Sequence, residues 1–136
     1  MDDRASNADE RLRIARAYFT TSAQLDWDGA RSLMTDDFIV TNVLGQTFTG
    51  DEMIARDRWY LDHLRNPVAK DVKILVTDEG FVAEYVVSFI GVNGAAHTMR
   101  CCGVFGIRDG KVATYNRYVD RTGLAEATAG VPGGPW

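Results

Sequence analysis

The sequence predicts an α+β fold, in which helices from the first half of the chain pack on one face of a curled antiparallel sheet formed by the second half. Two observations lead to this prediction. The first half carries apolar residues at helical spacing together with helix-capping residues, and the second half holds long runs rich in Val, Ile, Phe and Tyr between turn residues. A length of 136 residues suffices for one compact domain with its own core.

The N-terminal third predicts two helices. Apolar residues recur at helical spacing over residues 7–25, and Ser6 or Asn7 offers an N-cap region in front of them. Asp28 can cap a second, short helix that runs to Met34. The chain therefore opens with an amphipathic helix followed by a short one.

A short strand and a third helix follow. Residues 38–43 have a β-rich composition. Thr49 and Glu52 form a capping-box sequence, which predicts a helix over residues 51–64. The Asn-Pro pair at 66–67 ends that helix, because the residue before a proline avoids helical conformation.

The second half predicts four strands. They cover residues 72–77, 81–92, 96–107 and 111–119, separated by Asp78-Glu79-Gly80, Asn93-Gly94 and Asp109-Gly110. Consecutive strands joined by tight turns indicate an antiparallel meander. We expect a single domain over residues 1–129 and a flexible tail over residues 130–136, whose Trp136 ends a segment without a core pattern.

Composition excludes several classes of protein. The 15 Lys and Arg residues, against 19 Asp and Glu, form no basic stripe, so we expect no nucleic-acid partner. No signal peptide or membrane-spanning apolar run is present, which predicts a cytoplasmic protein without a membrane partner. The two cysteines are adjacent, which excludes a conventional disulfide framework. Two distant histidines and the lack of a glycine-rich strand-to-helix turn predict neither a metal site nor a cofactor.

Four sequence motifs carry a resemblance to a known family. They are Leu25-Asp26-Trp27-Asp28, Thr35-Asp36-Asp37-Phe38, Phe48-Thr49-Gly50-Asp51 and the run from Gly103 to Val112. With the order of elements, they resemble the SnoaL-like branch of the nuclear transport factor two-like superfamily over roughly residues 8–127. The resemblance implies a cone-shaped α+β barrel, its curved mixed sheet wrapped around the N-terminal helices, with a deep apolar pocket. It also implies a homodimer through the outer sheet face, where Tyr118 and Val104 have outward parity.

Relatives in this superfamily include polyketide cyclases, limonene epoxide hydrolases, ketosteroid isomerases, dehydratases and non-catalytic binding domains, so the fold alone selects no activity. The isomerases need an Asp base and an oxyanion pair of Tyr and protonated Asp. The resemblance places that tyrosine on Tyr18, the base on Asn42 and the protonated acid on Gly103. An amide cannot abstract a proton, so the isomerase mechanism is not expected.

The limonene epoxide hydrolases use an Asp-Arg-Asp set with a Tyr and an Asn that position water. The asparagine position of this set falls on Asn42 and matches. The resemblance places the other positions on Val86, Ser88, Arg117 and Val40, and none of these matches. Both carboxylates of the hydrolase set are therefore missing.

The resemblance also implies which residues line the pocket. With Gly103 and Ser88 facing inward, strand alternation places the following residues in the cavity. They are Val86, Ser88, Ile90, Met99, Cys101, Phe105, Tyr115, Arg117 and Val119. A two-residue turn at Asp109-Gly110 would pair Cys102 with Arg117, whereas a three-residue loop would pair Cys101 with Arg117. We expect the three-residue loop, because it keeps the family's register.

Arg117 and Asp57 are the sharpest catalytic candidates. A guanidinium in an apolar chamber needs a carboxylate or an anionic ligand, whereas Arg117 at a strand end would face solvent. Asp57 shares the apolar face of the third helix with Ile54 and Leu61. Paired with Arg117 in the pocket, it would stay ionised and could act as a general base; at the rim, the pair would be a weak salt bridge. Both interpretations stay open.

Three more residues complete the predicted catalytic set. Asn42 can hold a carbonyl group or a water, and Tyr18 can donate to a developing oxyanion. His97, nearer the open end of its strand, can shuttle a proton at the rim.

Two functions follow from these candidates. The first is a cofactor-free enzyme that acts on an apolar small molecule, such as a polyketide or terpenoid intermediate, by cyclisation, isomerisation, dehydration or epoxide opening. The alternative is a non-catalytic small-molecule binding or accessory domain of the same fold.

Overall fold

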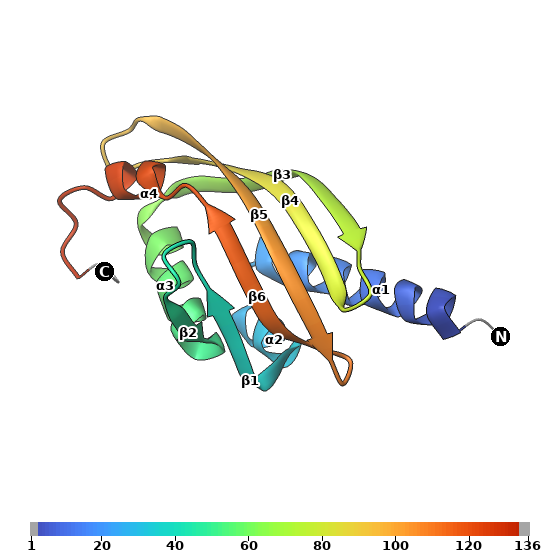
Figure 1. Ribbon diagram of the computed structural model, residues 1–136. Coiled ribbons are helices and arrows are strands. Elements are labelled where there is room, and N and C mark those ends of the chain that lie inside the picture. Colours follow the sequence, from blue (N-terminus) through green and yellow to red (C-terminus); the bar gives the residue numbers. More distant parts are fainter. Residues whose placement is uncertain (1–2, 134–136) are drawn as a thin grey trace.

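The structure is a computed structural model that describes residues 3–133 and, from Asn7 onward, their side chains. Its elements are α1 (Asp3–Ala23), α2 (Trp27–Ser32), β1 (Met34–Thr41), β2 (Thr47–Thr49), α3 (Gly50–His63), β3 (Arg65–Val76), β4 (Gly80–Ile90), β5 (Ala96–Arg108), β6 (Lys111–Val119) and α4 (Thr122–Ala127). They form a single six-stranded sheet with helices against its concave face (Figure 1). The α+β fold class is confirmed.

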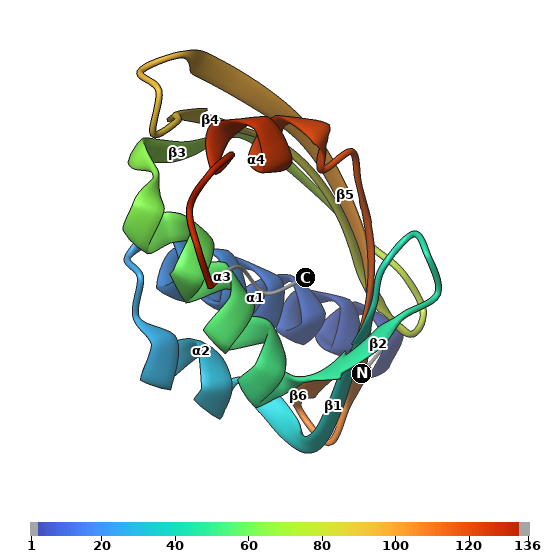
Figure 2. The same ribbon diagram turned by 90° about the vertical axis from the view of Figure 1, so that its left-hand side faces the viewer.

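The sheet is mixed and curled. Its strand order is β2-β1-β6-β5-β4-β3, with β1 and β6 parallel and every other neighbouring pair antiparallel. Figure 2 shows the sheet arching over α1, α2 and α3, so that the helices occupy the hollow of an open cone. The predicted meander of the four long strands is confirmed.

The N-terminal helices begin elsewhere than predicted. Helix α1 already starts at Asp3, so Ser6 and Asn7 lie inside it rather than at its N-cap. The cap of α2 is Asp26 and not Asp28: the Asp26 carboxylate accepts a hydrogen bond of 2.9 Å from the Gly29 backbone N–H. The capping box of α3 is confirmed, with Thr49 and Glu52 each bonded to the other's backbone N–H.

Two strands are longer than predicted. Strand β1 begins at Met34 and β3 at Arg65, so the Asn-Pro pair at 66–67 lies inside a strand. Because β3 is at the edge of the sheet, Pro67 can lack a backbone N–H without breaking an interior ladder. Helix α4 was not predicted. A turn over residues 128–130 follows it, and residues 134–136 of the predicted tail, with Trp136, lie outside the described residues.

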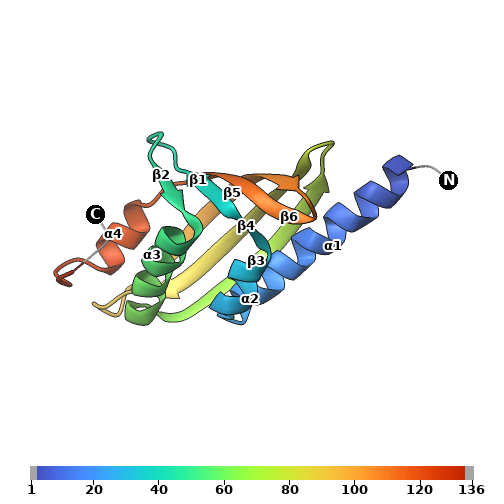
Figure 3. The same cartoon turned by 90° about the horizontal axis from the view of Figure 1, so that it is seen from below.

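An aromatic stack fills one end of the cone. Phe105 stacks on Phe81, with ring centroids 4.4 Å apart, and on Tyr115, at 4.1 Å. The Tyr18 ring meets Phe105 edge-on at 5.3 Å and joins α1 to the sheet. A second cluster, formed by Tyr60, Leu64, Phe89, Leu124 and Ala127, joins α3, β4 and α4. Seen from below, α4 lies at the end of the molecule opposite to the N-terminus of α1 (Figure 3).

A β-bulge sets which face β6 presents to the helices. Asp109 and Gly110 form a two-residue turn with φ of 54° and 76°, and Arg108 pairs with Lys111, so the predicted three-residue loop is wrong. The register shifts by one residue at Ala113, and Arg117 then lies opposite Gly103 instead of Cys101 or Cys102. Because Gly103 and Cys101 share one face of β5, Arg117 still points into the cone.

Candidate functional site

The hollow of the cone contains a cavity of about 490 Å³. Most of its lining is apolar. Helix α3 contributes Met53, Ile54 and Leu61, its C-cap residue Leu64 adds to them, and the sheet contributes Val87, Phe89, Met99 and Val119. A cavity of this size and composition is typical of a small-molecule site.

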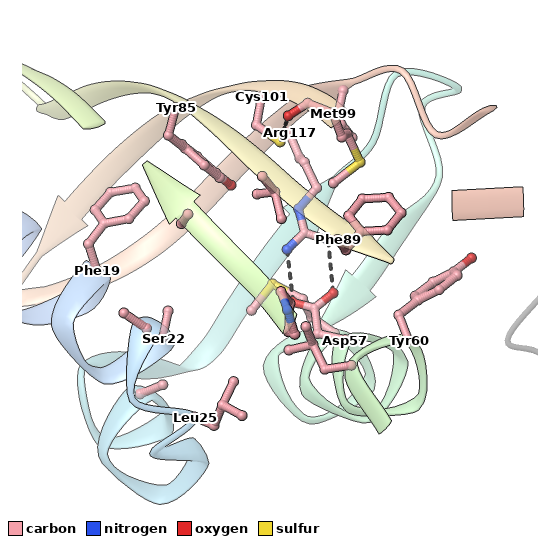
Figure 4. Close-up of a pocket in the computed structure, with 18 of the residues that line it drawn as sticks. Phe19, Ser22, Leu25, Asp57, Tyr60, Tyr85, Phe89, Met99, Cys101 and Arg117 are labelled. Carbon is pink, nitrogen blue, oxygen red and sulfur yellow. Dashed lines mark hydrogen bonds and ion pairs between the residues drawn. The ribbon is translucent and has the colours of Figure 1, made fainter. Parts of the chain in front are cut away.

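Asp57 and Arg117 meet inside this cavity. Arg117 Nη1 donates to Asp57 Oδ1 at 3.2 Å and Nη2 donates to Oδ2 at 3.0 Å, which makes a bidentate ion pair (Figure 4). The Arg117 side chain is only 20% exposed and the Asp57 side chain 26%, so the pair is not a solvated rim contact. Burial is the largest single influence and would lower the pKa of Arg117, but the charge and hydrogen bonds of Asp57, together with Tyr115 and Tyr85, outweigh it and hold the pKa well above its ordinary value.

Local sequence explains how both partners reach the cavity. Asp57 follows Ile54 by three residues and precedes Leu61 by four, and all three side chains line the cavity from one face of α3. The bulge at Ala113 turns Arg117 to the same side, beneath the face of Tyr115, whose ring centroid lies 5.0 Å from the Arg117 guanidinium carbon. Of the two interpretations that the sequence left open, the structure has the one in which Asp57 and Arg117 pair in the pocket.

Tyrosine hydroxyls supply further polar groups. The hydroxyl oxygens of Tyr85 and Tyr115 lie 3.2 Å apart and share a hydrogen bond, and Tyr18 also lines the cavity. Burial, reinforced by Tyr115, raises the pKa of Tyr18 and of Tyr85 far above the ordinary value for tyrosine. These hydroxyls consequently keep their protons at physiological pH and are available as donors.

Figure 4 places labelled side chains on both sides of the ion pair. Phe19 and Tyr85 lie toward one side, and Phe89 and Tyr60 toward the other. The charged pair thus spans the cavity from α3 to the sheet, with aromatic surface on either side of it.

Part of the predicted lining is in place. The structure brings seven of the predicted residues to the cavity: Tyr18, Asp57, Met99, Cys101, Tyr115, Arg117 and Val119. Burial raises the pKa of the Cys101 thiol to about 11, so Cys101 serves as a small apolar filler rather than as a nucleophile.

The predicted lining by β4 is wrong. Val86, Ser88 and Ile90 face away from the cavity. The reason is the hairpin loop 91–95, which holds five residues, so Ile90 pairs with Ala96 and even-numbered residues of β4 lie opposite even-numbered residues of β5.

Phe105 also does not line the cavity. It has the predicted inward orientation, but it is only 2% exposed and is held between the rings of Phe81 and Tyr115 in the core.

Asn42 lies outside the cavity as well. Its side chain closes the β1–β2 turn, where Oδ1 accepts from the backbone N–H groups of Leu44 and Gln46, each at 3.0 Å. Its Nδ2 donates to the Gln46 side chain at 2.9 Å. These local bonds use the amide as a turn cap, a common role for asparagine.

His97 is covered rather than at an open rim. Its ring stacks on Phe89 with centroids 5.6 Å apart, near Gly123 of α4, and it does not line the cavity. Within the described residues its Nε2 is buried and has no hydrogen-bond partner. No route for a proton from His97 to the Asp57–Arg117 pair follows from this placement.

Sequence reasoning missed several cavity residues. Tyr85, Val87 and Phe89 occupy the places assigned to their neighbours on β4. Arg121 lines the cavity where β6 leads into α4, and it continues the alternation of Arg117 and Val119. That two-residue period was the signal available for Arg121.

Residues 3–133 hold no group of three or more His, Cys, Asp or Glu side chains arranged to bind a metal ion. In the same range, no helix combines the length and the apolar character needed to cross a bilayer.

Comparisons with known proteins agree with this architecture. A candidate polyketide cyclase from Xanthomonas campestris pv. campestris superposes with a TM-score of 0.76 at 19% identity, covering 90% of this chain and 99% of that one. An LEH-like epoxide hydrolase from M. tuberculosis gives 0.70 at 19% identity, covering 89% and 90%. A candidate isomerase from Bacillus subtilis gives 0.73 at 12% identity, covering 90% and 94%. These identities show a shared fold alone.

Sequence comparison is more specific about the family. No curated protein matches the chain. The family model for the SnoaL-like domain matches residues 15–115, a span that holds Tyr18, Asp57 and Tyr115. The chain belongs to the SnoaL-like domain family.

Proposed function

We propose that this protein is an enzyme that transforms a largely apolar small molecule by acid–base chemistry, with Asp57 as the proton-transfer group. The observation that carries the proposal is the bidentate Asp57–Arg117 pair inside an apolar cavity. Removing two charges from water costs free energy that an apolar lining would avoid. A cavity that served only to hold an apolar ligand would not need such a pair.

Asp57 has the chemistry of a general base. Its carboxylate accepts a proton from a substrate C–H or O–H group, or from a water that attacks the substrate, and later returns a proton to the product. Arg117 holds the carboxylate in one orientation through two hydrogen bonds and keeps its own proton throughout. Its remaining N–H groups are available to a substrate oxygen.

The tyrosines would stabilise the oxygen on which charge develops. Tyr85 and Tyr115 are joined by a hydrogen bond in which either hydroxyl can donate, so the accepting hydroxyl can direct its own O–H toward a substrate oxygen. Tyr18 lines the same cavity as a neutral phenol. Donors fixed in a site of low polarity stabilise a developing enolate or alkoxide more than water does.

A binding or accessory domain is the second candidate function. It is favoured by the absence of the acids that the resemblance associates with known chemistry, since Asn42 caps a turn and glycine stands at position 103. In that case the ion pair orients a bound ligand, and the ligand is released without chemical change.

Product analysis separates the two functions. Apolar epoxides and polycyclic ketones would first be screened by the rise they cause in melting temperature, because a ligand that binds the folded state stabilises it. Each stabilising compound would then be incubated with the protein and analysed by mass spectrometry and chiral chromatography. The enzyme proposal expects conversion of at least one compound. Recovery of every bound compound unchanged after long incubation would favour the binding domain.

A further inference from the structure

Arg121 is a second guanidinium of the cavity that the proposed chemistry does not use. It lines the cavity next to Leu124, at the junction of β6 and α4. Its guanidinium carbon lies 5.1 Å from the centroid of the Tyr60 ring, and Tyr60 itself is buried. Stacking on a ring face leaves the N–H edges of a guanidinium available to other partners.

The charges around the cavity do not balance. Among the described residues that line it, Arg117 and Arg121 are cationic and Asp57 is the acid. Both oxygens of Asp57 are already bound by Arg117. Within residues 3–133, no carboxylate lies within 4 Å of the Arg121 guanidinium. Counted over the described lining residues, Arg121 therefore carries an excess positive charge.

The surroundings of Arg121 make that charge unfavourable in the free protein. Burial lowers the pKa of Arg121, Tyr60 and Asp57 oppose this shift, and the charges of Arg117 and Arg56 add to it. An anionic group placed against Arg121 would offset both the cost of burying its charge and the repulsion from the other arginines. The same group would gain little from Arg117, whose charge is neutralised by Asp57.

We propose that the substrate is an amphipathic acid, whose carboxylate is bound by Arg121 while its apolar part fills the cavity beside the Asp57–Arg117 pair. The inference rests on the proposed function and names the substrate class of the same site. A cavity of about 490 Å³ with an apolar lining accommodates a body of one to two rings. Arg121 then sets the orientation of the substrate, and Asp57 acts on the apolar part.

Binding of matched acids and amides tests this inference. The probes are 4-phenylbutanoate, 6-phenylhexanoate and 2-naphthylacetate, each beside its primary amide, which has nearly the same shape without the charge. Dissociation constants would be measured by calorimetry on the wild type, Arg121→Met, Arg121→Gln and Arg121→Lys. Arg100→Met is the matched control, because Arg100 is exposed on the outer face of β5 and its loss removes the same charge.

The inference expects the wild type to bind the best acid at least about tenfold more tightly than its amide, the size of one charged hydrogen bond. Arg121→Met and Arg121→Gln should remove this preference, Arg121→Lys should retain part of it, and Arg100→Met should retain it fully. Equal binding of acids and amides by the wild type would overturn the inference. So would an acid preference that survives in both Arg121→Met and Arg121→Gln.

Two further results keep this inference distinct from the proposed function. An acid preference that depends on Arg121, without any conversion of the ligands, would support the anion site and count against the enzyme. Conversion of neutral compounds, together with equal binding of acids and amides by the wild type, would support the enzyme and overturn the anion site. The melting temperature of each ligand-free variant shows whether it is folded, and the glutamine variant replaces the methionine variant if the latter is not.

Discussion

Asp57 on α3 and Arg117 on β6 form two parallel hydrogen bonds, of 3.2 Å and 3.0 Å, across a largely apolar cavity. The two residues are 60 positions apart in the chain, so the contact exists only when the helix lies in the hollow of the sheet. Packing of α3 against the sheet therefore assembles the ion pair of the candidate site.

Breaking this pair should destabilise the protein more than replacing both partners. Arg117→Met leaves the Asp57 carboxylate unpaired in an apolar cavity and should cost about 2–3 kcal/mol, because a buried charge without a partner is unfavourable. The double variant Asp57→Leu/Arg117→Met should lie within about 1 kcal/mol of the wild type. Urea unfolding of the wild type and the variants, including Asp57→Leu alone, measures the coupling. Additive effects of the two substitutions would contradict a buried pair.

Stability should fall in alkaline solution because buried phenols resist ionisation. The pKa of Tyr18 and of Tyr85 is raised in the folded state, chiefly by burial, whereas an unfolded tyrosine ionises near pH 10. Above that pH the folded state holds more protons than the unfolded state, so the unfolding free energy decreases as pH rises. Each tyrosine should contribute a slope of up to about 1.4 kcal/mol per pH unit.

Tyr18→Phe and Tyr85→Phe check this expectation. Each substitution removes one ionisable phenol, so unfolding measured between pH 9 and pH 11 should show a shallower decrease than in the wild type. The burial of Cys101, with its pKa raised to about 11, adds a smaller fall that begins near pH 9 and remains in both variants. Slopes identical to that of the wild type would show that the tyrosines are not buried as described.

Gly103 provides the space into which two aromatic rings pack. A Cβ at this position would lie 2.5 Å from a ring carbon of Tyr115 and 2.6 Å from a ring carbon of Phe105. Gly103→Ala should therefore displace the stack and lower the unfolding free energy by about 1–3 kcal/mol. Gly123→Ala is the control, because the nearest atom to its Cβ would be 3.9 Å away, an ordinary contact. Equal melting temperatures for the two variants would contradict this packing.

The outer face of the sheet is expected to form a homodimer. Tyr118 and Val104 project from it and are 51% and 40% exposed, as their outward parity predicts. A large exposed apolar patch on a sheet favours association. Light scattering should give twice the monomer mass for the wild type, and Tyr118→Arg should shift it toward the monomer. Thr98→Arg, on the same face among less apolar residues, should not. A monomeric wild type would contradict this expectation.

Local signals in the sequence predicted much of the fold. The capping box at Thr49 specifies the start of α3, and turn dipeptides with alternating apolar residues specify the meander. Helix α4 was missed because it has six residues and no side-chain cap, and it depends on burying Leu124 and Ala127. Long-range packing of this kind leaves little local signal.

The candidate site was predicted only in part, because the face that each strand presents to the cavity depends on its register. Asp57 and Arg117 could be found from a helix face and a strand face, although the turn that places Arg117 is different from the one expected. The resemblance placed Ser88 and Gly103 on one face, but the register of β4 and β5 pairs Gly103 with Ala83, so Tyr85 and Val87 line the cavity instead of Val86 and Ser88. Loop length and bulges decide such facing, and their residues carry only weak sequence signals.

The most direct test of the central claim is the turnover of Asp57→Asn on a converted substrate, measured beside Asp62→Asn. Asp62 lies on the same helix but is exposed, so its substitution removes the same charge without entering the cavity. If Asp57 transfers the proton, kcat of Asp57→Asn should fall by about a hundredfold or more, while Asp62→Asn keeps the wild-type value. Full turnover by a normally folded Asp57→Asn variant would contradict the account.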